Sequence, residues 1–406
     1  MACNNTTYME LINNSTELQN DFLKYKFIVS TWNHNVPMAM MVNKCVTPVW
    51  IIIGVFGNVI SALVWANPRM RTCNTAAYYL TCLAVADLTF LILHLIYELE
   101  NPWLLGTLDV YIWCQIFSMS NMAVQYLCVF LVLAFTVERF LSVCHPFKAE
   151  KFGKTRTPRT IFFLFLTSLL LSFPHGYFWD ISLVGECVVR MDEFQPDSFF
   201  SIYTWCTELA IFGVIPLIVL LLNVAVLYKV RTVGQLRIGK PKHLAYESRQ
   251  SQDSSMSALV VDNDHRCVKR FSGNTNGGYN ANYKGTTVTL LWVSFYLIFT
   301  MLPNTVLYAM QANIPFGPMP CLIEEMAGDP DWRNYFSFIS VKIVVKELSL
   351  SHHVGNVFIY LATSRRFLRL TLNSFFTQTK RCGSETRETS LHTIRAAQNR
   401  TLGDEV

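Results

Sequence analysis

The residues that could do chemistry are charged side chains placed within long apolar stretches. Glu138 and Arg139 follow residues 116–137, an uncharged run that is long enough to cross a bilayer as one helix. The pair could be an ordinary solvated helix end, but Phe140 continues the apolar pattern, so we expect it to lie within the helix. Asp87 interrupts another apolar run. Because a charge inside lipid is costly, such residues are expected to face protein or water and to serve a function.

A serine followed by two histidines, at residues 351–353, could indicate hydrolysis or a metal site. Successive residues of a helix point about 100° apart, so His352 and His353 are not expected to clasp one ion from one face. We see no other enzyme signature in the sequence. The sequence therefore predicts a protein that is not an enzyme and that needs neither a cofactor nor a metal ion.

The composition is that of a membrane protein. Of 406 residues, 52% are hydrophobic and 15% are charged, where about a quarter is usual for charged residues. The net charge of +5 is modest and gives no reason to expect a nucleic-acid partner. Lysine and arginine gather in alternate loops, for example around Arg69, Lys151 and Arg366, and the positive-inside rule places these loops in the cytoplasm. The other loops are acidic, so we expect an acidic outer face.

Seven apolar segments predict an all-α membrane protein that forms a seven-transmembrane helix bundle. The expected spans are 46–66, 75–97, 114–146, 160–179, 199–230, 286–311 and 336–362. A short amphipathic eighth helix is expected at 365–376, followed by Cys382, which is either palmitoylated or unmodified. The expected regions are an outer tail at 1–45, a membrane domain at 46–363 with a disordered cytoplasmic loop at about 232–284, and an inner tail at 364–406.

The expected outer tail lacks an apolar run of the signal-peptide type, so the first span is expected to insert as its own anchor. Four asparagines in this tail each begin an Asn-x-Ser/Thr sequon: Asn4, Asn5, Asn13 and Asn14. Together they predict a glycosylated N-terminus outside the plasma membrane.

Several short motifs occur in the order and at the spacing of one receptor family. They are Cys114 with Cys187, Glu138-Arg139-Phe140, Leu-Ala-Val-Ala-Asp-Leu at 83–88, Pro216 and Pro303 within helices, and Asn356 with Tyr360. The chain is thus similar to rhodopsin-like (class A) G-protein-coupled receptors, and it resembles the FMRFamide-type invertebrate neuropeptide receptors. It departs from the family at Met301, where a tryptophan is usual, and at Val357, where a proline is usual.

The resemblance implies an activation mechanism at the inner face. Arg139 is expected to pair with Glu138 at rest and to be freed toward a heterotrimeric G protein when the sixth helix swings outward. Tyr360 is expected to fill the vacated space, and Phe140 belongs to the same coupling region. Phe147 is expected either to plug into a G-protein pocket or to pack under its own loop. Arrestin, a receptor kinase and membrane lipid are the further partners that the family implies.

The resemblance also implies a polar core between the helices. Asn58, Asp87 and Asn356 match polar positions of the family, and Asp87 and Asn356 are among those that surround a sodium ion there. Here His352, His353 and Cys128 replace the usual small polar lining. Two interpretations stay open: satisfied polar packing between helices, or a histidine that pairs with Asp87 and makes activation sensitive to pH.

Two disulfide bonds are expected on the outer face. The family resemblance implies that Cys114 is bonded to Cys187. Cys45 and Cys321 both lie just outside expected spans on the same side, so a second bridge between them is a further prediction.

The ligand class can be narrowed by two positions. Asn121 stands where amine receptors carry an aspartate, and Leu350 stands where opsins carry a retinal-binding lysine, so neither class is expected. The candidate ligand-binding residues are His94, Glu98, Asn121, Gln125, Glu208, Met301, Lys342 and Lys346. Glu208 could instead form a structural ion pair with a lysine of the seventh helix. An acidic outer surface attracts cations and favours a basic peptide, or an amidated one that ends in Arg-Phe.

These observations predict a G-protein-coupled receptor for an extracellular neuropeptide, acting through outward movement of the sixth helix. One alternative is an atypical receptor for a small non-peptide ligand, which the departures at Met301 and Val357 favour. Another is a seven-helix transporter or channel, which would predict internal repeats that we do not find in the sequence.

Overall fold

The structure is a computed structural model of the chain. It describes residues 31–71, 74–100, 103, 105–144, 146–181, 187–190, 198–238, 276–311, 314, 317 and 326–373. Side chains are described throughout these ranges except at 146–155, 231, 233–238 and 276–287. Most of the described residues are helical, as the sequence predicts.

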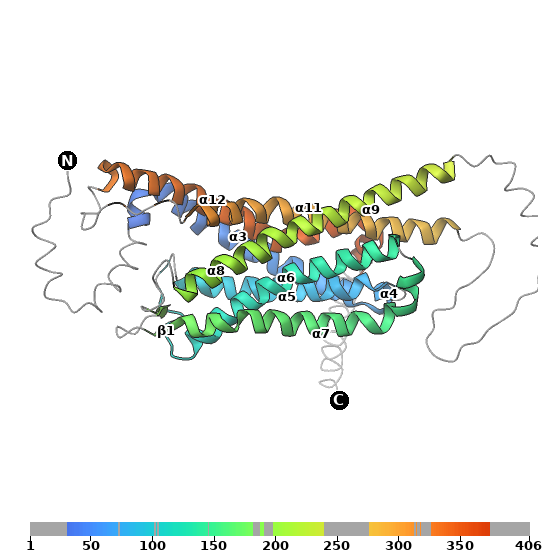
Figure 1. Ribbon diagram of the computed structural model, residues 1–406, viewed down its shortest axis with the longest axis horizontal. Coiled ribbons are helices and arrows are strands. Elements are labelled where there is room, and N and C mark those ends of the chain that lie inside the picture. Colours follow the sequence, from blue (N-terminus) through green and yellow to red (C-terminus); the bar gives the residue numbers. More distant parts are fainter. Residues whose placement is uncertain are drawn as a thin grey trace, which may run out of the picture.

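Among the described residues, seven long helical segments lie side by side along the longest axis of the molecule (Figure 1). They are α3 (Pro37–Ala66), α5 (Ala76–Glu100), α6 (Trp113–Cys144), α7 (Pro146–Phe178), the composite of α8 (Phe199–Glu208), η2 (Leu209–Val214) and α9 (Ile215–Ile238), α11 (Asn276–Gln311) and α12 (Pro330–Thr363). The shorter elements include α4 (Pro68–Arg71), the strands β1 (Trp179–Ile181) and β2 (Cys187–Val189), and the 3-10 helix η3 (Met326–Gly328). The predicted seven-helix bundle is confirmed.

Several helices extend beyond the apolar runs that predict them. α3 begins at Pro37 rather than near residue 46, because proline suits the first helical turn, where no hydrogen-bonded N–H is needed. α7 begins at Pro146 and so includes the stretch expected to be a cytoplasmic loop. α9 and α11 both continue into the region 232–284, of which residues 239–275 lie outside the described part. An apolar run therefore marks the part of a helix that lipid surrounds, not the ends of the helix.

Six helices of the described part are long and apolar enough to cross a membrane. α12 is not among these six, because its middle carries Lys342, Lys346 and Glu347 and two histidines. Glu347 is buried and both lysines are partly buried, so α12 turns its charge toward neighbouring helices.

The lateral surface of the bundle, around the sides of the helices, is apolar, while polar groups lie inside the bundle. Large side chains such as Phe56, Leu170 and Leu221 are 68%, 75% and 69% exposed, whereas Asp87 and Asn58 are buried. This distribution is the one expected for helices that face lipid, since lipid offers no penalty to an exposed apolar side chain.

Pro216 explains an irregularity in the fifth span. The π-helix η2 ends at Val214, just before this proline, which cannot donate to the carbonyl of Phe212 four residues earlier. The Phe212 carbonyl instead accepts a hydrogen bond from Thr305 Oγ1 of α11, at 3.2 Å. The proline thereby links the fifth and sixth spans through a freed backbone acceptor.

A short hairpin closes the outer side of the bundle. β1 and β2 pair antiparallel, with Ile181 opposite Cys187, and the predicted disulfide Cys114–Cys187 ties the hairpin to α6. The backbone N–H of Cys187 also donates to Asp109 Oδ1 at 3.0 Å. Cys45 lies within α3, is exposed, and has no disulfide partner among the described residues. Cys321 lies outside them, so the second bridge stays a prediction.

The predicted eighth helix is present at residues 365–373. Its Phe367 is fully buried, with its ring centre 5.4 Å from that of Trp65 and 5.5 Å from that of Tyr360. The Arg366 guanidinium donates to the backbone carbonyl of Arg69. These contacts hold the segment against the inner ends of α3 and α12.

Candidate functional site

At the inner end of the bundle, Glu138 and Arg139 of α6 face neighbouring helices. Glu138 accepts hydrogen bonds from Thr75 Oγ1 and, at 3.5 Å, from Thr157 Oγ1 of α7. Arg139 is only 7% exposed, and its Nη2 donates to Asn74 Oδ1 at 3.3 Å. Both charges therefore lie within the bundle and not at a solvated helix end. The resting ion pair between these two residues stays a prediction.

Tyr360 lies in an aromatic group near the inner end of α12. Its ring packs edge-on against Trp65 of α3, with 5.4 Å between ring centres. Its hydroxyl is buried and has no hydrogen-bond partner in the described part of the chain. Because a buried hydroxyl gains free energy when it finds a partner, this position fits the movement expected of Tyr360. Phe140 lies beside Arg139 on α6, and the side chain of Phe147 lies outside the described residues.

Asp87 of α5 is fully buried in the middle of the bundle and has three hydrogen-bond partners. His353 Nδ1 of α12 lies 2.7 Å from Asp87 Oδ1, and Asn356 Nδ2 donates to Oδ2 at 2.9 Å. Cys128 Sγ of α6 donates to Oδ1 at 3.4 Å. Three helices thus converge on one carboxylate. We define the central cluster as Asp87, Cys128, His352, His353 and Asn356.

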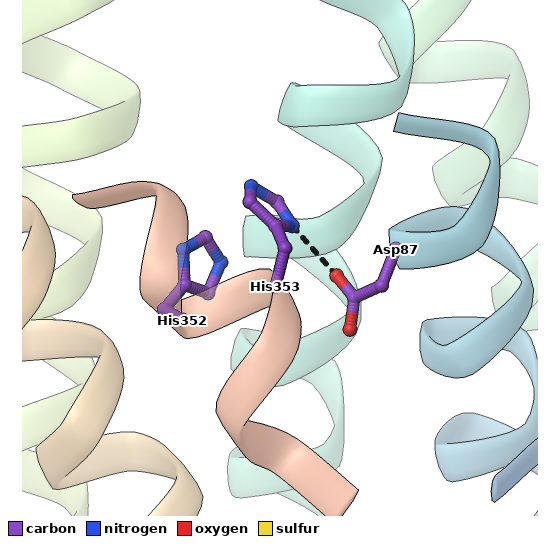
Figure 2. A group of neighbouring side chains, drawn as sticks. All are labelled: Asp87, His352 and His353. Atoms are coloured by element: carbon purple, nitrogen blue, oxygen red, sulfur yellow. Dashed lines mark hydrogen bonds and ion pairs between the residues drawn. The ribbon is translucent and has the colours of Figure 1, made fainter. Parts of the chain in front are cut away.

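The two histidines of the central cluster lie against each other, with 3.7 Å between ring centres. Figure 2 shows His353 turned toward Asp87 and His352 beside it, and one ligand atom from each of the three residues lies within 4.8 Å of the others. The prediction that the two imidazoles cannot approach one ion is therefore wrong, because rotation about their side-chain bonds overcomes the 100° helical offset. Asn58 of α3 holds the local backbone by donating to the His353 carbonyl at 2.8 Å.

A second buried polar group lies nearer the outer ends of α3, α5 and α12. Lys346 Nζ forms an ion pair with Glu98 Oε1 at 2.8 Å, and His94 Nε2 lies 3.3 Å from the same oxygen. Asn43 Nδ2 donates to Glu98 Oε2 at 3.2 Å and to Glu347 Oε1 at 2.8 Å. One amide therefore bridges two carboxylates. We define the outer cluster as Asn43, Thr47, His94, Glu98, Lys346 and Glu347.

The outer cluster contains an unbalanced charge. Glu347 Oε1 accepts from Asn43 and, at 2.7 Å, from Thr47, but Glu347 Oε2 is buried without a hydrogen-bond partner among the described residues. The cluster thus holds two carboxylates but a single lysine, Lys346, which pairs with Glu98. With His94 neutral, the cluster has a net formal charge of one negative unit.

Sequence reasoning missed three members of the outer cluster: Asn43, Thr47 and Glu347. Asn43 falls in the expected outer tail, since the apolar run begins after it, and Thr47 at the start of that run is an ordinary polar residue. Glu347 is an ionisable residue inside a membrane helix, which is the signal that identifies Asp87. The same rule, applied to position 347, would have identified Glu347.

The remaining candidates for ligand contact are brought together only in part. Lys342 Nζ donates to Gln311 Oε1 at 2.5 Å, and Glu208 of α8 has no ion pair with any described residue. The alternative of a Glu208 ion pair with a lysine of α12 is therefore not seen in this structure.

Three further candidates lie on α6 and α11. Gln125 Nε2 donates to the backbone carbonyl of Asn121 at 3.4 Å, one turn away on α6. Met301 is buried, and its Sδ accepts a hydrogen bond from Ser349 Oγ of α12 at 3.4 Å. These contacts are separate from those of the outer cluster, which unites His94, Glu98 and Lys346.

Residues 57–332 match a family model described as 7 transmembrane receptor (rhodopsin family). This stretch is more than half of the 406 residues. The chain belongs to the rhodopsin family of seven-transmembrane receptors. It is therefore a multi-pass membrane receptor and not an enzyme.

Named relatives match shorter stretches of this rhodopsin-family receptor. Neurotensin receptor type 1 of Rattus norvegicus is 32% identical over 132 residues, which are 30% of this chain and 30% of the relative. The same receptor of Homo sapiens is also 32% identical over 132 residues, covering 30% of this chain and 31% of the relative. The substance-P receptor of Cavia porcellus is 25% identical over 198 residues, covering 44% and 47%. The chain thus matches less than half the length of each of these relatives.

The family match covers only part of the two clusters. It includes Asp87, Glu138 and Arg139 but ends at Trp332, so the α12 residues of both clusters lie beyond it. The narrower resemblance to FMRFamide-type receptors is not confirmed, since the relatives named above are neurotensin and substance-P receptors, and it stays a prediction.

Proposed function

We propose that this rhodopsin-family receptor responds to an extracellular peptide that carries a positive charge, and that it signals through a heterotrimeric G protein. The observation that carries the proposal is the outer cluster, where Asn43 joins the carboxylates of Glu98 and Glu347 and the single lysine, Lys346, pairs with Glu98. Glu347 Oε2 is buried without a donor among the described residues. Because a buried carboxylate without a counter-charge is costly, a cationic group of a ligand would stabilise this cluster on binding.

Glu208 adds a third carboxylate to the outer half of the bundle. Lys342 lies within electrostatic range of Glu208, although its ammonium group donates to Gln311. Three carboxylates against two lysines leave one net negative charge, with His94 neutral. An arginine guanidinium can bond two carboxylate oxygens at once, so a peptide with an arginine near an amidated end suits this charge.

Two further observations support the proposal. The relatives that share about a third to a half of their length with this chain are receptors named for neurotensin and substance P, which are peptides. The absence of an aspartate at position 121 and of a lysine at position 350 argues against an amine ligand and against retinal. Arg139, buried at the inner end of α6, is the residue that would reach the G protein.

The proposal includes a setting in the cell. The receptor would lie in the plasma membrane with its N-terminus outside, and arrestin, a receptor kinase and membrane lipid would be its other partners. The sequons at Asn4, Asn5, Asn13 and Asn14 and the thiol of Cys382 lie outside the described residues, so glycosylation and palmitoylation stay predictions.

The first test is guanine-nucleotide exchange on a panel of G proteins, in membranes that contain the full chain. A library of amidated peptides, with and without a terminal Arg-Phe, would be applied to the chain and to its Arg139→Ala variant. We expect exchange with basic peptides that disappears in the variant at equal surface expression. Silence of the whole library with normal surface expression would overturn the peptide proposal.

A second test addresses the acidic residues. The charge reversals Glu98→Lys and Glu208→Lys, combined, are expected to abolish the potency of an active basic peptide and to leave surface expression intact. The matched control is Asp331→Lys, because Asp331 is an exposed acid near the outer end of α12 and outside the cluster. Unchanged potency in the combined variant would refute the role of these two residues.

A further inference from the structure

The central cluster holds three side chains whose chemistry suits a metal ion other than sodium. One ligand atom from each of Asp87, His352 and His353 lies within 4.8 Å of the others, and all three residues are buried. The carboxylate comes from α5 and both imidazoles come from α12 (Figure 2). The group therefore joins two helices that are far apart in the sequence.

The hydrogen bond of His352 determines which ring nitrogen can bind a metal. Its Nδ1 lies 3.0 Å from the backbone carbonyl of Ser349. Because a carbonyl can only accept, Nδ1 carries the hydrogen, and the lone pair of the neutral ring is on Nε2. His352 is 3% exposed, and its Nε2 has no hydrogen-bond partner within the described ranges.

Satisfied polar packing would leave this nitrogen unexplained. Buried polar atoms are nearly always paired, and an exception points to an ion or another group that is missing from the count. A histidine held at one nitrogen by a carbonyl, with its ring beside a carboxylate and a second imidazole, has the surroundings of a metal ligand.

Two further side chains hold the Asp87 carboxylate in place by hydrogen bonds. Asn356 Nδ2 donates to Oδ2 at 2.9 Å, and Cys128 Sγ donates to Oδ1 at 3.4 Å. Hydrogen bonds of this kind fix the orientation of a ligating carboxylate. The Asp87–His353 contact of 2.7 Å already brings two of the three ligand groups together.

We propose that Asp87, His352 and His353 bind a divalent transition-metal ion, Zn²⁺ in the cell, that bridges α5 and α12. Imidazole nitrogen suits zinc and copper, whereas hard cations such as sodium, calcium and magnesium prefer oxygen ligands. Three protein ligands leave the fourth tetrahedral position to water, as in many zinc sites. The site departs from a sodium site because two of its three ligand atoms are nitrogen and not oxygen.

The geometry requires a small adjustment. Zinc bound to nitrogen and oxygen at about 2.0–2.1 Å holds its ligand atoms roughly 3.4 Å apart. The three ligand atoms lie within 4.8 Å of one another, so side-chain rotations are enough to close the site. The ion would replace the direct Asp87–His353 hydrogen bond and would give His352 Nε2 its missing partner.

The proposal does not rest on the identity of the receptor's ligand, because metal binding can be measured without one. The full chain would be purified in detergent, stripped with a chelator and titrated with Co²⁺, whose visible absorption reports tetrahedral coordination, and then with Zn²⁺ as a competitor. We expect one Zn²⁺-displaceable Co²⁺ per chain. In His352→Gln and His353→Gln the affinity should fall at least about tenfold, a loss that even supporting residues of metal sites produce.

The matched control is His175→Gln. His175 is equally buried, but it lies on α7 and its Nε2 contacts Tyr126 Oη at 3.2 Å, outside the central cluster. This variant should bind the metal as the unchanged chain does. Three results would overturn the proposal. They are the absence of stoichiometric binding, metal affinity in both cluster variants equal to that of the unchanged chain, and a loss of affinity in His175→Gln as large as in the cluster variants.

A measurement on the unchanged chain covers the case in which a variant fails to fold. X-ray absorption of the zinc-loaded receptor should show nitrogen and oxygen neighbours at about 2.0–2.1 Å with the scattering pattern of imidazole. A spectrum without imidazole would overturn the proposal regardless of the variants.

Discussion

The central and outer clusters place buried carboxylates between the same two helices, about three helical turns apart on α5, yet they are balanced in different ways. Asp87 is met by His353, Asn356 and Cys128, and none of the described residues that contact it is a lysine or arginine. Glu98 is met by a full positive charge on Lys346. The central carboxylate is thus held by polar donors, and the outer one by an ion pair.

The difference lies also in what each cluster leaves unpaired. The central cluster leaves His352 Nε2 without a hydrogen-bond partner, whereas the outer cluster leaves a carboxylate oxygen, Glu347 Oε2. His94 Nε2 of the outer cluster also makes no hydrogen bond within the described residues, but it lies 3.3 Å from the Glu98 carboxylate. A lone pair on imidazole attracts a transition metal, while an excess carboxylate attracts any cation. Two buried sites with similar residues can therefore serve a structural bridge in one case and ligand recognition in the other.

The largest effect is expected when Asp87 is replaced by alanine. The change leaves His353, Asn356 and Cys128 without their acceptor in the interior, and breaking a buried pair typically costs about 3–5 kcal/mol. We expect a loss of this size in the free energy of unfolding, measured by thermal unfolding of the purified chain in detergent. Val85→Ala is the control, since Val85 is on the same helix but 50% exposed toward lipid, and it should change stability by less than about 0.5 kcal/mol. Equal losses in the two variants would contradict the structural role of the central carboxylate.

A smaller effect is expected at the ion pair of the outer cluster. Lys346→Met leaves Glu98 and Glu347 facing each other without a cation, but the lysine side chain is 37% exposed, so solvent reduces the loss to about 2 kcal/mol. Glu98→Gln in the same chain should restore most of it, since the repulsion is then removed. A double-mutant cycle on thermal stability measures the coupling.

The control for this cycle is Lys342→Met, because Lys342 contacts Gln311 and not Glu98. Its loss should be smaller, and Glu98→Gln should not restore it. A coupling energy near zero between Lys346 and Glu98 would mean that the outer cluster is held like the central one, by polar donors alone.

A still smaller effect is expected where both clusters depend on the close approach of α3. A Cβ atom at Gly54 would lie 2.5 Å from Leu91 Cδ1 and 3.0 Å from Val354 Cγ2, so Gly54→Ala should force α3 away from α5 and α12. Overpacking of this kind costs about 1–3 kcal/mol, and we expect the lower end because the closest atom is the tip of the Leu91 side chain, which can rotate. Gly213→Ala is the matched control, since its Cβ would meet Thr305 at an ordinary 3.5 Å. Equal thermal stability of the two variants would show that α3 can shift without cost.

Much of the fold could be predicted from the sequence, because lipid imposes strict rules on helix length and charge. The sequence locates all seven helices, although α12 is less apolar than the other six because of the charges in its middle. The Cys114–Cys187 bond follows from the family resemblance. Helix ends could not be predicted in the same way, since polar residues such as Asn43 continue a helix beyond its apolar run. The position of Pro37, which favours the first turn, was the available signal.

The sites could be predicted less completely, because side-chain contacts depend on rotamers and on neighbouring helices. The sequence identifies Asp87 as a buried acid and suggests a histidine as its partner. It does not show that the His352 ring also lies in the bundle interior, against the ring of His353. The sequence does not show which neighbours Lys346 and Glu347 contact, because adjacent residues of a helix point in different directions. In the structure they point to different partners, Glu98 and Asn43.

The smallest effect on stability is expected at Glu347, and this is the sharpest test of the comparison. Glu347→Gln keeps the oxygen that accepts from Asn43 and Thr47 and removes only the excess charge on Oε2. Since removal of an uncompensated buried charge is neutral or favourable, the free energy of unfolding should stay within about 1 kcal/mol of the unchanged chain.

The potency of an active basic peptide in the nucleotide-exchange assay should nevertheless fall about tenfold, which corresponds to about 1.4 kcal/mol of binding energy. An analogue of the same peptide with a neutral residue in place of its arginine should show no such difference between the two chains. A loss of stability as large as that of Asp87→Ala, with unchanged potency, would mean that the outer carboxylates hold the bundle together as the central one does, and that the ligand's charge is met elsewhere.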